Sequence, residues 1–182
     1  MADLRKGRRV GADVVTVRPV PGQPSRAIVS CGGITVPAAL GRSGRSAFKR
    51  EGDGATPIAS MRFLYGFMRG DRVGSLRTAL PMRPIMKDML WCDQPDHASY
   101  NRLVRAPFCR SHEEMMRNDG LYDICLVLDW NITSRRRHRG SAIFFHIARE
   151  GYRPTEGCVA VSLADMRRLL PHIRVGTRLV VL

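Results

Sequence analysis

The chain has 182 residues, of which 44% are hydrophobic and 25% are charged. This composition fits one folded domain and excludes a disordered chain, and no apolar run approaches the roughly 18 residues of a transmembrane helix. The net charge is +14 at pH 7, and all but three of the 30 basic residues are arginines. Such a balance suits an anionic partner, namely a carboxylate-rich wall peptide, a membrane surface or a nucleic acid. A solvated, arginine-rich surface accounts for the charge equally well.

Short runs of β-branched and apolar residues predict strands in the first half of the chain. Gly32 and Gly33 stand between two of these runs and predict a hairpin turn. The basic, glycine-rich segment 41–54 predicts a surface loop, and residues 69–71 (Arg-Gly-Asp) predict a turn. The predicted strands cover 13–18, 26–31, 34–36 and 61–68.

The second half of the chain combines strands with two short helices. Residues 80–91 are rich in proline and methionine, and we expect them to be irregular. Ser111 and Glu114 form a capping box that predicts a helix to about Asn118. The near-continuous apolar run 121–130 is typical of a buried strand. The remaining predicted elements are a strand at 141–147, a helix from Ser162 to Pro171 and a strand at 178–182. With no repeat and no linker, the pattern predicts a mostly β fold in one domain.

The five cysteines show no metal-binding pattern. No two of them are spaced as C-x-x-C, and no histidine pair has the spacing of zinc ligands. The odd number permits two disulfides and one free thiol. Cys31 and Cys125 lie in apolar runs, where a buried free cysteine is the usual interpretation. The full set is Cys31, Cys92, Cys109, Cys125 and Cys158.

One histidine and one cysteine stand at the edges of apolar runs joined by a turn. The run 141–147 delivers His146, the turn contains Gly151 and Pro154, and Cys158 precedes the next apolar run. Two groups so placed can come into contact, and a cysteine nucleophile with a histidine base needs that contact. For a lone pair of this kind, a buried cysteine and a histidine bonded to the backbone would be the default interpretation.

This stretch resembles the catalytic motif of the L,D-transpeptidase (YkuD-type) family, a His followed by a spacer and Ser/Thr-His-Gly-Cys. His146 matches the base, Thr155 the residue whose carbonyl helps orient it, and Gly157 with Cys158 the nucleophile turn. Two residues depart from the pattern: Glu156 replaces a second His, and Ala160 replaces an Arg. The resemblance extends over about 13–182, through the segments 49–57 (Lys-Arg-Glu-Gly-Asp-Gly-Ala-Thr-Pro), 91–93 (Trp-Cys-Asp), 100–102 (Tyr-Asn-Arg) and 122–131.

The resemblance implies a β-sandwich of the YkuD type with two or three short helices over 13–182, after a basic segment 1–12 whose composition permits disorder. It implies peptidoglycan L,D-transpeptidation, in which Cys158 attacks a donor stem peptide and an amine takes the acyl group. His146 would be the base, and the N–H groups of Gly157 and Cys158 would form the oxyanion hole. No cofactor or metal is implied, and carbapenems are expected inhibitors. Expected substrate contacts are Ser141, Asn131, Trp91, Tyr100, Asn101 and Glu156.

Two alternatives remain open from the sequence. One is an L,D-carboxypeptidase or endopeptidase that uses the same Cys–His pair with water. The other is a non-catalytic module that binds an anionic wall polymer. A nucleic-acid partner is not expected, because no basic motif is interleaved with aromatic residues. The arginine-rich segment 135–139 is either a solvated loop or an electropositive lip that attracts anionic peptides.

The resemblance implies a location in the cell envelope, where the substrate lies. Residues 1–10 are polar and basic, and no apolar segment of a signal peptide follows them. Three explanations are compatible with this: a start further upstream, an unconventional export route, or a protein that works inside the cell.

Overall fold

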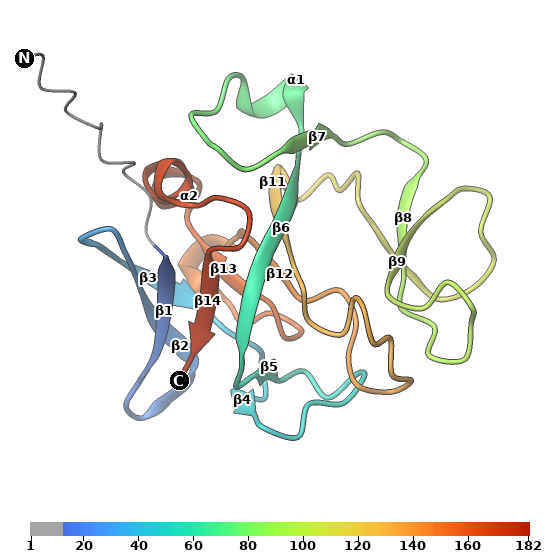
Figure 1. Cartoon of the computed structure of the whole chain (residues 1–182), viewed down its shortest axis with the longest axis horizontal. Coiled ribbons are helices and arrows are strands. Elements are labelled where there is room, and N and C mark those ends of the chain that lie inside the picture. The colour runs from blue at the N-terminus through green and yellow to red at the C-terminus, as the bar shows by residue number, and fades with distance from the viewer. Residues whose placement is uncertain (1–12) are drawn as a thin grey trace, which may run out of the picture.

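The computed structural model describes residues 13–182, so the predicted segment 1–12 lies outside the described residues (Figure 1). Its centre is a nine-stranded sheet in the order β11-β12-β13-β3-β2-β1-β14-β6-β7. These strands are β1 (Val14–Val20), β2 (Gln23–Cys31), β3 (Ile34–Ala39), β6 (Ser60–Met68), β7 (Met82–Pro84), β11 (Ile124–Leu128), β12 (Phe144–Ile147), β13 (Val159–Val161) and β14 (Arg178–Val181).

The sheet closes on itself. Strand β6 pairs with β14 through its first residues and with β11 through the rest of its length, so the two ends of the sheet meet. Closure removes most open edges and leaves the two halves of the sheet facing each other as the layers of a flattened β-sandwich. The predicted mostly β, single-domain fold with short helices is therefore confirmed.

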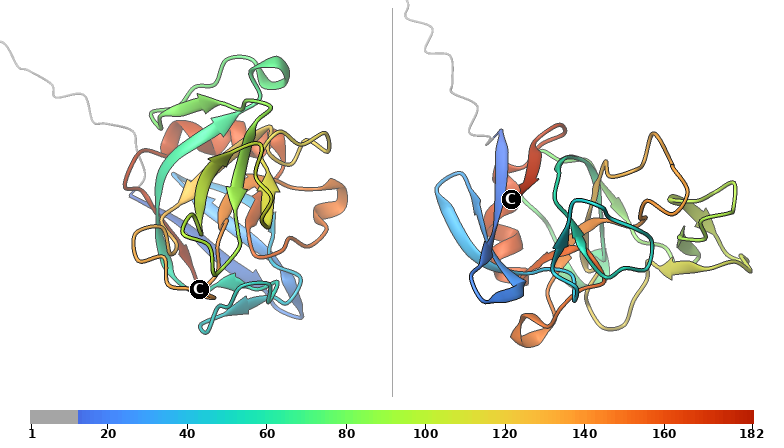
Figure 2. Two further views of the ribbon diagram at one scale, coloured as in Figure 1. Left: turned by 90° about the vertical axis from the view of Figure 1, so that its right-hand side faces the viewer. Right: turned by 90° about the horizontal axis from the view of Figure 1, so that it is seen from below.

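Smaller elements surround this sheet. Strands β8 (Met89–Cys92), β9 (Arg102–Arg105) and β10 (His112–Glu114) form a three-stranded sheet, and β4 (Arg45–Ser46) pairs with β5 (Thr56–Pro57). In Figures 1 and 2 the three-stranded sheet lies beyond β11 and β12, at the opposite end of the molecule from β1–β3. The helical elements are α1 (Gly70–Val73), η1 (Glu150–Tyr152), α2 (Leu163–Leu169) and η2 (Leu170–His172). None of the helices within 13–182 is long and apolar enough to cross a membrane.

Strands β11 and β12 are buried on both faces. All five residues of β11 and all four of β12 are buried. On one face, Leu126 and Phe145 join the core between the sandwich layers, which α2 caps. On the other face, Cys125 and Phe144 join a second core beneath the three-stranded sheet. This double burial explains why the sequence is almost continuously apolar there instead of alternating.

Most predicted strands are confirmed within a few residues. The hairpin of β2 and β3 turns at Gly32 and Gly33, both with positive φ (56° and 82°), as predicted from the glycine pair. The predicted helix after Ser162 is α2, and the Ser162 side chain caps it by accepting a hydrogen bond from the Asp165 N–H.

The predicted helix at 111–118 is wrong. Residues His112–Glu114 form strand β10, which pairs with β8 in an antiparallel register that sets Glu113 opposite Trp91. The capping-box pattern is a local signal, and the pairing with a distant strand buries Met115 in the second core, which a surface helix would not do. Tertiary contacts therefore decide this segment.

Two other local predictions also need correction. Residues 80–91, predicted to be irregular, contain β7 and most of β8. The turn predicted at 69–71 leads into the single-turn helix α1. Each of these elements is short, and its backbone is ordered by a neighbouring strand or loop that the local sequence does not reveal.

Asn101 joins the three-stranded sheet to the central sheet. Its side chain is buried, with 1% of its surface exposed. The Oδ1 atom accepts hydrogen bonds from Trp91 Nε1 (3.0 Å) and the Ala142 N–H (3.1 Å), and Nδ2 donates to the Trp130 carbonyl (3.1 Å). One amide thus holds three segments that are far apart in the sequence.

The Asn101→Ala variant should lose about 2–4 kcal/mol of folding stability, because three buried hydrogen-bonding groups lose their partner. Urea unfolding at neutral pH measures this loss. The control is Asn118→Ala, at an exposed asparagine, which should stay within about 0.5 kcal/mol of the wild type. Equal stability of the two variants would contradict the role assigned to Asn101.

Candidate active site

The parallel pairing of β12 with β13 brings His146 and Cys158 to the same face of the sheet. His146 pairs with Ala160, and Phe145 pairs with Val159, so Cys158 lies just before β13, beside Phe144. Side chains two residues apart on a strand point to the same face. Phe144, His146 and Cys158 therefore all face the second core, although eleven residues separate the histidine from the cysteine in the sequence.

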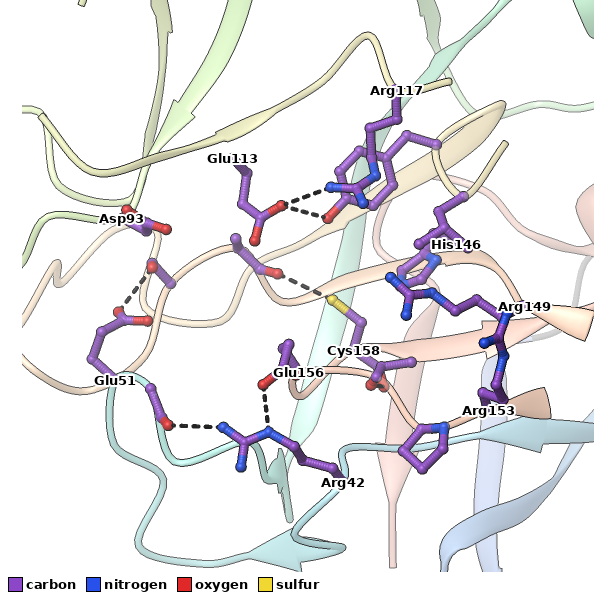
Figure 3. Close-up of a pocket in the computed structure, with 17 residues that line it drawn as sticks. Arg42, Glu51, Asp93, Glu113, Arg117, His146, Arg149, Arg153, Glu156 and Cys158 are labelled. Atoms are coloured by element: carbon purple, nitrogen blue, oxygen red, sulfur yellow. Dashed lines mark hydrogen bonds and ion pairs between the residues drawn. The ribbon is translucent and has the colours of Figure 1, made fainter. Parts of the chain in front are cut away.

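Both residues line a cavity of about 310 Å³ between the central sheet and its surrounding loops (Figure 3). Cys158 is 7% exposed and His146 is 5% exposed, so both reach the cavity from a mostly buried position. Its other lining residues are Arg42, Glu51, Gly52, Asp93, Glu113, Arg117, Leu121, Tyr122, Ser141, Ala142, Arg149, Arg153, Pro154, Thr155 and Glu156.

Two backbone groups hold the Cys158 sulfur, one in the loop that leads into β12 and one in the first residue of β12. Sγ accepts a hydrogen bond from the Phe144 N–H (3.3 Å) and donates one to the Ala142 carbonyl (3.2 Å). No hydrogen bond joins Sγ to the imidazole among the described residues. The two side chains share the cavity as expected, but the thiol proton is directed at Ala142 instead of His146 in this conformation.

The His146 ring is fixed by its own strand and by a neighbouring ring. Nδ1 lies 2.9 Å from the Ile147 carbonyl, and because a carbonyl only accepts, Nδ1 carries the proton and Nε2 is the basic nitrogen. The Tyr122 ring packs edge-on against the imidazole at 5.3 Å between centroids. The resemblance had assigned the orienting carbonyl to Thr155; here that carbonyl accepts from the Arg42 N–H (2.8 Å).

Burial keeps both groups neutral at pH 7. It raises the pKa of the Cys158 thiol to about 12, and the Phe144 N–H bond acts weakly against this. It lowers the pKa of His146 to about 4. Burial also raises the pKa of the Glu113 carboxyl, although Arg117 beside it acts in the other direction. The site therefore rests as a thiol and a neutral imidazole.

Thr155 and Gly157 shape the turn that leads into Cys158. Thr155 Oγ1 donates to the Cys158 carbonyl (2.7 Å) and accepts from the Gly157 N–H (3.1 Å). Gly157 has φ of +133°, and a Cβ there would lie 2.8 Å from the Ala55 carbonyl oxygen. A glycine is needed at this position both for its backbone conformation and for the close approach of Ala55.

The loop at 49–55 forms one wall of the cavity. Lys49 is 2% exposed, and its ammonium bonds the Asp53 carboxylate and the Arg50 carbonyl. Asp53 also accepts from the Arg50 and Ala55 N–H groups. Partial burial acts to raise the pKa of Asp53, but these hydrogen bonds, first the one from Lys49, lower it below its ordinary value. The Lys-x-Glu-Gly-Asp pattern thus folds the loop around a buried ion pair, and Glu51 and Gly52 reach the cavity.

The predicted substrate contacts fall into two groups. Ser141 and Glu156 line the cavity: Ser141 donates to Glu51 (2.8 Å), and the exposed Glu156 pairs with Arg42 (2.7 Å). The other four residues do not line it and instead support its walls. Tyr100 donates to Glu51, and Trp91 and Asn101 hold the Ala142 peptide as described above. Asn131 bonds the Arg136 and Gly140 carbonyls and so orders its own loop.

Glu156 both faces solvent and affects the nucleophile. Its side chain is 73% exposed, and its charge adds a small contribution to the raised pKa of Cys158, after burial and the charge of Glu113. Ala160, the other departure from the family pattern, is fully buried in β13 and cannot contact a ligand.

The arginines of the cavity are not those predicted as a lip. Residues 135–139 do not line the cavity; Arg137 and His138 lie near Asp96 on the surface. The arginines that do line it are Arg42, Arg117, Arg149 and Arg153, and the acidic residues that line it are Glu51, Asp93, Glu113 and Glu156. Arg149 and Arg153 stand between His146 and Cys158 in the sequence, so the spacer of the motif could have suggested them.

Comparison with known proteins identifies one family and one solved structure similar to this chain. A family model described as the L,D-transpeptidase catalytic domain (YkuD) matches residues 26–181. Among solved structures, the chain is similar to Mycobacterium tuberculosis L,D-transpeptidase 1, with 15% sequence identity and a TM-score of 0.39 over 92% of this chain. The match covers 61% of that solved chain. No curated protein sequence matches this chain.

The Gly157→Ala variant should slow the alkylation of Cys158 by iodoacetamide and lower stability by about 1–3 kcal/mol, because the new Cβ collides with the Ala55 backbone. Peptide-resolved mass spectrometry measures the alkylation rate. The matched control is Gly176→Ala, which also has a positive φ (+85°) but has no atom within 4 Å of the new Cβ. An unchanged Cys158 alkylation rate in Gly157→Ala would contradict the role of this turn.

The free energy of unfolding should fall as the pH is lowered from about 6.5 to about 4. In this range His146 stays neutral in the folded protein, whereas it takes up a proton in the unfolded chain. The unfolded state binds more protons there, so the contribution of His146 to stability decreases as pH decreases, by at most about 1.4 kcal/mol per pH unit. Urea midpoints of the wild type and His146→Asn at pH 7 and pH 4.5 measure it. The variant should lose less stability than the wild type; parallel losses would contradict a neutral, buried His146.

Proposed function

The chain belongs to the family of L,D-transpeptidase catalytic domains, which acts on peptidoglycan stem peptides, and we propose that it transfers an acyl group between such peptides through a thioester on Cys158. One observation carries this proposal: Cys158 and His146, the two residues that match the catalytic motif, open into the same cavity from adjacent parallel strands. Because the proposed substrate lies in the cell envelope, we propose that compartment as the place where the protein works.

In the proposed reaction, Cys158 first turns its thiol from the Ala142 carbonyl toward the imidazole. His146 Nε2 takes the proton from Sγ, and the sulfur attacks the carbonyl carbon of the donor, typically an L-centre of diaminopimelate as the resemblance implies. The carbon–nitrogen bond then breaks, and His146 returns the proton to the leaving amine. An amine of a second stem peptide then attacks the thioester carbonyl, the carbon–sulfur bond breaks, and the proton that the amine loses passes through His146 to the sulfur.

The oxyanion of the tetrahedral intermediate needs a backbone donor near Cys158. The Gly157 N–H, one of the two predicted donors, is bonded to Thr155 Oγ1. We therefore assign the oxyanion contact to the Cys158 N–H. The Phe144 N–H, which bonds Sγ in the resting state, would stabilise the thiolate as it forms.

A hydrolase on the same scaffold differs only in the acceptor, since water would replace the amine. The acidic wall of the cavity, Asp93 with Glu113 and Glu51, favours transfer because carboxylates attract the ammonium group of an acceptor and give water no comparable advantage. The ammonium group must lose a proton before its nitrogen attacks the thioester. Asp93 Oδ1 is buried without a hydrogen-bond partner among the described residues, which leaves it available to such a donor.

The direct test incubates purified tetrapeptide muropeptides, alone and with an added D-amino acid, with the wild type and with Cys158→Ala. Mass spectrometry of the products should show a cross-linked dimer or an exchanged terminal residue with the wild type only. Loss of one residue without dimer or exchange would identify a carboxypeptidase. No Cys158-dependent product would contradict both enzymes and favour the wall-binding module.

Carbapenems should acylate Cys158, because the opening of the β-lactam ring by a thiolate gives a stable thioester. Intact-mass spectrometry should detect one adduct on the wild type and none on Cys158→Ala. With His146→Ala the adduct should form about 100-fold or more slowly, as expected when a general base is removed. An equal rate in His146→Ala would exclude His146 as the base without excluding Cys158 as the nucleophile.

A further inference from the structure

Two of the four arginines in the cavity form no ion pair within residues 13–182, although Arg149, after Arg117, adds a longer-range charge interaction that helps lower the pKa of Asp119. Arg42 and Arg117 are neutralised by carboxylates of this chain. Arg149 and Arg153 are exposed, and within residues 13–182 neither side chain forms an ion pair or a hydrogen bond. The carboxylates that neutralise the first two are Glu156 at 2.7 Å from Arg42, and Asp119 at 2.6 Å and Glu113 at 3.5 Å from Arg117.

Arg26 holds the loop that carries Arg149 and Arg153 in place. Arg26 donates to the Gly151 carbonyl (2.6 Å), and its guanidinium lies over the Tyr152 ring, 5.6 Å from the centroid. The Tyr152 N–H bonds the Arg149 carbonyl (2.9 Å), and both Gly151 and Tyr152 adopt positive φ (65° and 52°) to close this tight turn. The arginines therefore extend from a defined backbone, which lowers the cost of ordering them around a ligand.

Both arginines lie on the His146 side of the nucleophile. Figure 3 shows Arg149 and Arg153 beside the imidazole, while Glu51, Asp93 and Glu113 lie on the other side of Cys158. The position of the base has a chemical consequence, because the histidine that takes the thiol proton returns it to the leaving amine. The leaving part of the donor must therefore lie on the side of the cavity where the two arginines are.

We propose that Arg149 and Arg153 bind the free carboxylate of the residue that leaves from the donor peptide. When that residue is the last of the peptide, its amine and its carboxylate are attached to the same carbon, so a carboxylate lies next to the nitrogen that His146 protonates. Guanidinium groups bind carboxylates through paired, charge-assisted hydrogen bonds. This inference rests on the proposed function and adds a specificity determinant to it.

The arginine pair would select against internal bonds. As the sulfur–carbon bond forms and the carbon–nitrogen bond breaks, His146 delivers one proton to the nitrogen, and a terminal residue leaves as a free amino acid. Cleavage of an internal bond would place an uncharged amide where the carboxylate stands. An amide carries no charge to pair with the guanidinium groups, so the pair favours removal of a single C-terminal residue.

The test compares two donor peptides that differ only at the C-terminus, one with a free carboxylate and one with an amide. For the wild type, kcat/KM should be about 10–100-fold higher with the free carboxylate. The double variant Arg149→Gln, Arg153→Gln should bring this ratio close to one, because it lowers kcat/KM only for the donor with the free carboxylate. The control double variant, Arg136→Gln with Arg137→Gln, removes the same charge outside the cavity and should keep the wild-type ratio.

A binding measurement separates this inference from the proposed function. Cys158→Ala, which cannot react, should bind the free-acid donor more tightly than the amide, and adding the Arg149 and Arg153 substitutions should abolish that difference. Equal binding of the two peptides, or equal turnover of both by the wild type, would overturn the inference and leave the proposed function intact. No Cys158-dependent turnover with a preserved binding difference would instead refute the proposed function and support the arginine site.

Discussion

The parallel pairing of β12 with β13 is the constraint on which the site depends. Parallel neighbours cannot be joined by a tight hairpin, so the chain must cross over between Ile147 and Val159. That crossover supplies the loop with Arg149 and Arg153 and the turn with Thr155 and Gly157. The register of the pairing then sets Cys158 beside Phe144 and on the same face as His146. A shift of one residue would turn the nucleophile into the opposite core.

A shell of buried polar groups holds the segments around this pairing. The ammonium group of Lys49 bonds the backbone of its own loop, residues 49–55, and Glu51 of that loop accepts hydrogen bonds from Tyr100 and Ser141. Asn101 then fixes the peptide of Ala142, whose carbonyl accepts the thiol proton. These links are buried or half-buried polar groups with hydrogen-bond partners, which rigidifies a site otherwise built from loops. The residues of the Lys-x-Glu-Gly-Asp, Trp-Cys-Asp and Tyr-Asn-Arg segments therefore act mainly as supports for the cavity.

Burial gives the resting site an unreactive form. A thiol with a pKa near 12 beside an imidazole with a pKa near 4 is almost entirely protonated at neutral pH. In the proposed reaction the donor carbonyl accepts the electrons of the sulfur as the proton moves to His146. The charge therefore appears when the Cys158 N–H is in place to receive the oxyanion.

The sequence by itself determined most strands of the central sheet, the capped helix after Ser162 and the placing of His146 and Cys158 at the edges of two neighbouring apolar runs, because each depends on residues close together along the chain or on a short motif. Only the tertiary structure decided that His112–Glu114 is a strand, since its partner β8 lies about twenty residues away and overrides the local capping box. It also decided that Asn101 and Trp91 support the cavity wall, and that Arg149 and Arg153 line the cavity while residues 135–139 do not. Charge and polarity are visible in a sequence, but which charges find a partner inside the fold depends on contacts between distant segments, and those contacts determine which arginines remain available to a ligand.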